Sequence, residues 1–99
     1  MLIKTEALEI VTKKLQQMSA SADPFVLVEK STIEKPFGWV FFYNAKRFVE
    51  TGESRYRLAG NGPVIVNKHN GSVEFFGSAK PPQEIVAEYE QKLAGGKKP

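Results

Sequence analysis

The 99-residue chain has no cysteine, one histidine and one aspartate, and these shortages exclude several classes of function. Without cysteine there is no disulfide, no thiolate metal site and no cysteine nucleophile. A zinc or iron site needs clustered histidine or cysteine ligands, which His69 alone does not supply. The dense aspartate and asparagine of a calcium loop are missing too. The sequence therefore predicts no bound metal and no cofactor.

Catalytic residues in a plausible arrangement are also lacking. Nucleophilic catalysis needs a nucleophile, a base and an orienting group held together. His69 falls in a predicted hairpin turn and Asp23 precedes a proline, so nothing in the sequence brings them together. Glu84, Glu88 and Glu90 share one predicted helix, where such glutamates usually form a solvated face. We expect a protein that is not an enzyme.

Charge of one sign is not concentrated anywhere in the chain. The formal net charge is +3, and Lys97 and Lys98 supply two of those charges near the end. A nucleic-acid binder usually carries a clustered basic face instead. No apolar run approaches the ~20 residues of a membrane helix, and the residues 1–6 lack the apolar core of a secretory signal. We expect a cytoplasmic protein that binds neither nucleic acid nor membrane.

What the chain does contain is enough apolar material for one core. Hydrophobic residues make up 41% of the sequence, including seven phenylalanines, which argues against disorder. The length allows a single domain. We expect that domain to span residues 1–94, and residues 95–99, with two glycines and two lysines, to form a flexible tail.

Apolar residues at three- and four-residue spacing predict a helix near each end of the chain. Residues 19–24 are turn-forming and end the first helix, and Pro81 and Pro82 open the second. The stripe of the first helix consists of Ala7, Leu8, Val11, Leu15 and Met18. The stripe of the second consists of Ile85, Val86, Tyr89 and Leu93.

Four strands are predicted between these helices. Residues 34–37 form a connection, residues 46–62 form a loop with a short helical turn ended by Gly52, and residues 69–71 form a hairpin turn. The strands span residues 25–32, 38–45, 63–68 and 72–77. The predicted fold is α+β, in the order α-β-β-loop-β-β-α, with a four-stranded antiparallel sheet and two helices packed on it.

Both faces of this sheet carry large apolar side chains. Alternation puts Trp39, Phe41 and Tyr43 on one face and Val40 and Phe42 on the other. The last strand likewise divides, with Val73 and Phe75 on one face and Phe76 on the other. If both helices cover one face, the other is left apolar and suited to interaction. If the helices cover both faces, or the long loop folds over the sheet, no such face remains.

Several sequence blocks resemble a known family. They are Pro36–Asn44 (PFGWVFFYN), Phe48–Gly52 (FVETG), Leu58–Pro63 (LAGNGP), Val64–Lys68 (VIVNK) and Gly71–Val73, followed by Gly77, Pro81 and Tyr89–Glu90. In order and spacing they are similar to the immunity protein 35 family, also called the YrhB-like domain, from about Leu8 to about Glu90. The resemblance implies a protein that neutralises a cognate bacterial polymorphic toxin by binding it. One branch of the family is linked instead to a chaperone-like stress role.

The family's motif residues look structural, with glycines serving turns and aromatic residues serving the core. These residues are Gly38, Trp39, Phe41, Gly60, Asn61, Pro63 and Gly71. The chain is not strongly acidic, so a nuclease toxin engaged through a broad acidic face is disfavoured. Two other functions stay open, a chaperone-like protein that holds unfolded clients and an RNA-binding module, and so does the oligomeric state.

The partner-binding residues are predicted from residue type alone. Tyrosine and arginine often anchor protein interfaces, so the loop with Arg55, Tyr56 and Arg57 is the first candidate. Phe42 and Phe76 are the second. In the alternative reading, Tyr56 closes the edge of the core and the two arginines are solvated. The predicted mechanism is occlusion of the toxin, without covalent change.

Overall fold

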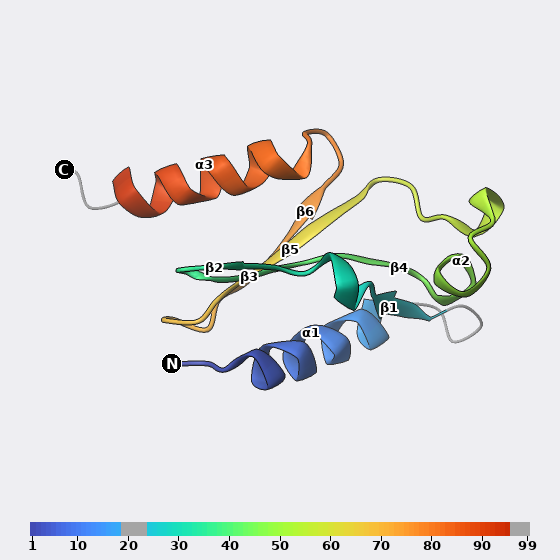
Figure 1. The fold of residues 1–99 in the computed structure, drawn as a ribbon, viewed down its shortest axis with the longest axis horizontal. Helices are drawn as coiled ribbons and strands as arrows, with labels where there is room; N and C mark the ends of the chain where they lie inside the picture. The colour runs from blue at the N-terminus through green and yellow to red at the C-terminus, as the bar shows by residue number, and fades with distance from the viewer. Residues whose placement is uncertain (19–23, 96–99) are drawn as a thin grey trace.

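The structure is a computed structural model that describes residues 1–18 and 24–95. It has a helix at each end and strands between them, as the sequence predicts (Figure 1). The helices are α1 (Lys4–Met18), α2 (Lys46–Thr51) and α3 (Pro82–Gly95), with short 3-10 helices η1 (Glu29–Ser31) and η2 (Ser54–Tyr56). The strands are β1 (Phe25–Leu27), β2 (Ile33–Lys35), β3 (Gly38–Phe41), β4 (Tyr43–Ala45), β5 (Asn61–Asn67) and β6 (Val73–Gly77).

The described strands form two antiparallel sheets. The larger has the order β2-β3-β5-β6, and the smaller pairs β1 with β4. In the larger sheet Trp39 lies opposite Val66 and Phe41 opposite Val64. Phe42, between β3 and β4, belongs to neither sheet, but its carbonyl accepts a hydrogen bond from the Val28 N–H at 2.8 Å. The chain therefore runs through one long, interrupted hairpin before it reaches α2.

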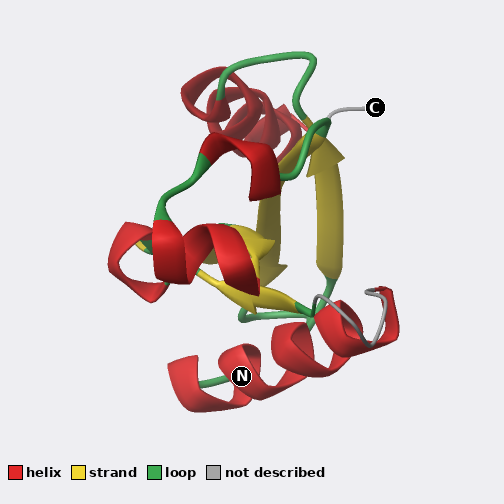
Figure 2. Cartoon of the chain, turned by 90° about the vertical axis from the view of Figure 1, so that its right-hand side faces the viewer, coloured by secondary structure: helices red, strands yellow, loops and turns green. Residues whose placement is uncertain are grey.

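The two terminal helices cover opposite faces of the larger sheet. Figure 2 shows the strands between α1 and α3, one helix on each side. The sequence left open whether the two helices cover one face of the sheet or both, and the structure shows one helix on each face. Because each face has its own helix, neither sheet face is left wholly exposed.

The core on the α1 side is built from the aromatic residues of β3 and β4. Trp39, Phe41 and Tyr43 all point to this side, where Val64 and Val66 of β5 join them. The helix contributes Ala7, Val11 and Leu15, which lie on one stripe. Met18, at the end of that predicted stripe, is exposed, unlike Ala7, Val11 and Leu15.

The core on the α3 side is smaller. Val40 and Ile65 meet Ile85, Val86 and Tyr89 of the helix. The Phe37 ring packs against the Tyr89 ring, with 4.9 Å between centroids. Leu93, predicted in the same stripe, is 41% exposed. The buried stripe of α3 therefore ends at Tyr89.

Several strand boundaries differ from the sequence prediction. Residues 25–32 form not one strand but β1 followed by η1, and the connection predicted at residues 34–37 contains most of β2. Pro36 had suggested a connection, yet it lies in the turn between β2 and β3, where its missing N–H costs nothing. The segment 38–45 divides into β3 and β4, and β5 already begins at Asn61.

The hairpin turn after β5 depends on a buried asparagine. The Asn67 side chain is almost fully buried, and its Oδ1 accepts the N–H groups of His69 (2.9 Å) and Asn70 (3.3 Å). Its Nδ2 donates to the Tyr89 hydroxyl at 3.2 Å. Asn67 therefore connects the β5–β6 turn to α3.

We expect Asn67→Leu to lower the free energy of unfolding by about 1–3 kcal/mol, because buried polar groups lose their partners. Urea denaturation measures this change. Asn70→Ala is the control, since the bond from the Ser72 N–H to Asn70 Oδ1 is exposed and its loss should cost much less. Equal losses in the two variants would contradict this role for Asn67.

Candidate functional site

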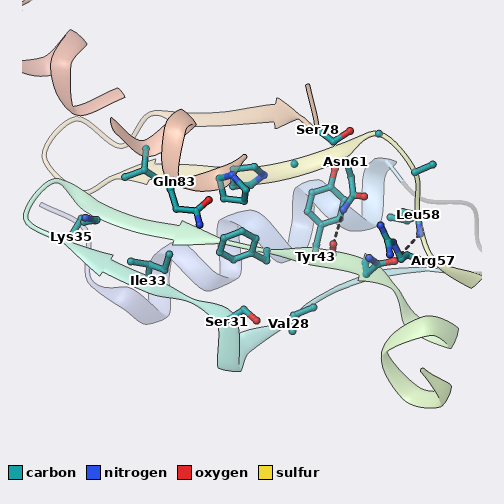
Figure 3. Close-up of a pocket in the computed structure, with 18 of the residues that line it drawn as sticks. Val28, Ser31, Ile33, Lys35, Tyr43, Arg57, Leu58, Asn61, Ser78 and Gln83 are labelled. Carbon is teal, nitrogen blue, oxygen red and sulfur yellow. Dashed lines mark hydrogen bonds between the residues drawn. The ribbon is translucent and has the colours of Figure 1, made fainter. Parts of the chain in front are cut away.

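An open groove of about 1030 Å³ lies on the α3 side of the molecule, where α3 does not cover the strands (Figure 3). Its walls are the first half of α3 on one side and the segment 28–35 on the other, with the loop 57–62 at one end. The apolar side chains that line it include Val28, Ile33, Phe42, Leu58, Pro63 and Val86. The groove therefore combines elements that are far apart in the sequence.

The groove forms because β4 separates from β5. The ladder between β3 and β5 ends at the pair Phe41–Val64, and β4 pairs only with β1. Side-chain amides replace the missing ladder bonds. Asn61 Nδ2 donates to the Tyr43 carbonyl at 2.8 Å, and the Leu58 N–H donates to Asn44 Oδ1 at 2.9 Å. These two bonds attach the loop 57–61 to β4 and fix one end of the groove.

The charged residues of the groove are Lys35, Arg57 and Glu90. Lys35 Nζ lies 3.8 Å from Glu90 Oε2, which joins β2 to α3. Arg57 forms no ion pair with any residue that the structure describes. Figure 3 shows Lys35 and Arg57 at opposite ends of the groove, so its free positive charge lies at the loop end.

Tyr43 lies in the groove lining and also in the α1-side core. Its ring packs near Phe25 and Phe75, with centroid distances of 5.9 and 6.0 Å. Burial raises the pKa of the Tyr43 phenol, because a charged phenolate would lose hydration there. The neutral phenol is therefore the form that this position favours.

The structure separates the five predicted partner-binding residues into three places. Arg57 and Phe42 line the groove. Arg55 pairs with Glu53 at 3.4 Å and lies over the Tyr56 ring at 4.7 Å, outside the groove lining. Phe76 lines a second hollow of about 400 Å³, beside α3. The loop thus presents only one of its three candidates to the groove.

That second hollow is closed in part by an ion pair. Lys80 Nζ lies 2.7 Å from Glu88 Oε2, and this hydrogen bond raises the pKa of Lys80. Both side chains are half exposed. The hollow is smaller than the groove. Two of its charged lining residues, Lys80 and Glu88, form an ion pair with each other.

Sequence reasoning missed most of the groove lining. Ile33 and Lys35 both line the groove, but the sequence prediction assigned Ile33 to no element and Lys35 to the connection 34–37. Val86 was assigned only to the core. A short alternating segment before Pro36 was the available signal for β2, whereas no sequence pattern shows where α3 crosses the sheet.

Two other kinds of site, a metal centre and a membrane-spanning helix, are not found in the described residues. Among residues 1–18 and 24–95, no three His, Asp or Glu side chains gather as metal ligands would. No helix within the described parts of the chain is long and apolar enough to span a membrane. His69 lies in the turn after β5, with its Nε2 3.3 Å from the Pro36 carbonyl. Asp23 lies outside the described residues.

Comparison with known proteins gives one family and one curated relative. The family model described as Immunity protein 35 matches residues 5–92. The relative, "Uncharacterized protein YrhB" from Escherichia coli (strain K12), is 46% identical over 57 residues. Those residues are 58% of this chain and 61% of the relative, so the match spans less than two thirds of either. No solved structure matches the chain. The family match includes both sheets and every residue that lines the groove.

Proposed function

Since the chain belongs to the immunity protein 35 family, we propose that it protects its producer by binding a cognate toxin and covering a surface that the toxin needs. The groove between α3 and the segment 28–35 is the proposed docking surface. The choice rests on Ile33, an apolar residue of the groove lining that is 40% exposed on a short edge strand, beside the half-buried Val28 and Phe42. Exposed apolar surface of this kind marks interaction sites.

The proposed mechanism is occlusion without chemistry. The groove offers apolar surface and an arginine. Its backbone is held in place by the side-chain hydrogen bonds of Asn44 and Asn61. A surface that is already ordered loses little conformational entropy on binding, which favours tight association. Binding alone would block the toxin, and the toxin would leave the complex chemically unchanged.

We place the complex in the cytoplasm of the producing cell. A chain without cysteine suits a reducing compartment, because it needs no disulfide to fold. The partner is a protein, and the interspersed charges of the chain disfavour a nuclease bound through a broad acidic face.

The test compares two substitutions of equally exposed apolar residues. We expect Ile33→Glu to weaken binding of the toxin encoded beside this chain's gene by at least about tenfold, because a charge enters the apolar lining. Leu93→Glu is the matched control, since Leu93 is 41% exposed but does not line the groove. Isothermal titration calorimetry gives both affinities, and melting curves show whether each variant remains folded.

Two outcomes would count against this proposal. If folded Ile33→Glu binds the toxin as well as the unsubstituted chain does, the groove is not the docking surface. If the chain does not bind this toxin but binds many unfolded proteins weakly, the chaperone-like alternative replaces the immunity role.

A further inference from the structure

The groove lining mixes apolar and uncharged polar side chains, and its charges are distributed unevenly between its two ends. At the α3–β2 end, the charges of Lys35 and Glu90 compensate each other. At the loop end, Arg57 is exposed and has no ionic partner among the described residues. A partner that fills the groove would therefore meet apolar side chains first and an uncompensated guanidinium at one end.

We propose that the groove takes a segment of the toxin that carries both an acidic and an apolar side chain, with the carboxylate at Arg57 and the apolar side chain over Phe42. This inference rests on the proposed function and names the chemistry of the partner at that same site. Carboxylates match the planar guanidinium of arginine better than any other protein group, because two parallel hydrogen bonds can form. An uncharged or basic segment would leave Arg57 unpaired at the edge of an apolar interface, which costs affinity.

Hydrogen bonds of the loop backbone hold Arg57 at this position. The next residue, Leu58, is attached to Asn44 through its N–H, and the Arg57 N–H donates to the Ser54 carbonyl at 3.0 Å. The backbone on both sides of the Arg57 side chain is therefore held, while the side chain itself remains exposed. Figure 3 shows Arg57 beside Leu58 and Asn61 at this end of the groove.

Arg55 provides a matched control two residues away. It is exposed on the same loop but is paired with Glu53 and lies outside the groove. A general attraction between this basic loop and an acidic toxin would respond to loss of either arginine. A carboxylate bound in the groove would respond to Arg57 alone.

The experiment measures the affinity of Arg57→Glu and Arg55→Glu for the toxin encoded beside this chain's gene, at low and at high salt. We expect Arg57→Glu to weaken binding at least tenfold at low salt, since like charges would then face each other. Arg55→Glu should change affinity only about twofold, as exposed ion pairs contribute little. In addition, short overlapping peptides of the toxin should identify a segment with an acidic residue, and changing that residue to arginine in the toxin should restore binding to Arg57→Glu.

Each other outcome overturns the inference. If Arg57→Glu binds as tightly as the unsubstituted chain while Ile33→Glu does not bind, the groove docks the toxin but its occupant is not acidic. If Arg55→Glu and Arg57→Glu lose affinity equally, the attraction is general to the loop. If neither Arg57→Glu nor Ile33→Glu changes the affinity, the inference and the proposed docking surface both fail.

Discussion

Replacing Trp39 with alanine is expected to lower the free energy of unfolding by about 3–5 kcal/mol, a large part of the stability of a typical domain. The side chain is only 7% exposed and packs in the cluster formed by Ala7, Val11 and Leu15 of α1 and by Val66 of β5. Its removal leaves a cavity between the helix and the sheet that neighbouring side chains fill incompletely. The contacts of the Trp39 ring within this cluster would then be lost.

Urea denaturation measures this effect as a lower midpoint. Trp39→Phe is the informative control, because it keeps much of the apolar volume and should recover a substantial part of the loss. If Trp39→Ala unfolds at the midpoint of the unsubstituted chain, Trp39 is not a core residue, and the α1 side of the fold is placed wrongly.

The second large effect is expected from Gly38→Ala. Gly38 has a φ of +148° and pairs with Asn67 across the β3–β5 ladder. A Cβ atom there would lie 2.0 Å from the Val66 carbonyl oxygen and 3.0 Å from the Lys68 nitrogen. Both are backbone atoms, Val66 in the central strand β5 and Lys68 directly after it, so the sheet itself must shift. We expect a loss of about 3 kcal/mol or more, from strained backbone and overpacking together.

Gly71→Ala separates the two causes of that loss. Gly71 also has a positive φ, +73°, but nothing lies within 4 Å of the position its Cβ would occupy. This variant therefore bears only the conformational cost of about 1–2 kcal/mol. Equal destabilisation of the two variants, measured by urea denaturation, would show that the close approach of β5 at Gly38 does not matter.

The two terminal helices were predictable because their stripes are regular. Ala7, Val11 and Leu15 are buried in α1, and Ile85, Val86 and Tyr89 are buried in α3, as their spacing indicates. The stripe alone did not show where contact with the sheet ends. Met18 and Leu93 continue the same spacing, yet both are exposed.

The division of the strands was less predictable because it depends on pairing. Residues 38–45 read as one strong strand, and residue alternation even assigns Trp39, Phe41 and Tyr43 to the correct face. What the pattern does not contain is the point where β4 leaves β5. That separation depends on the side-chain hydrogen bonds of Asn44 and Asn61. The sequence prediction placed Asn44 in a strand and Asn61 in a tight loop, and gave neither side chain this role.

The groove follows from that separation and from the path of α3. Its lining residues come from several segments, and only packing brings Ile33, Arg57 and Val86 to one surface. Residue type alone also selected Arg57 and Phe42, which line the groove, but it grouped Arg57 with Arg55 and Tyr56. The structure instead places Tyr56 near Arg55 and Arg47, with ring-centroid distances of 4.7 and 5.6 Å.

Hydrogen–deuterium exchange of the chain, alone and saturated with the toxin that it is proposed to neutralise, tests the docking surface most directly. Binding is expected to slow amide exchange in the segments 28–35 and 57–62, which form a wall and the loop end of the groove. Exchange on the outer face of α1 should stay unchanged, because that helix covers the opposite side of the sheet. Slower exchange confined to α1, with no change in those two groove segments, would contradict the proposed docking surface.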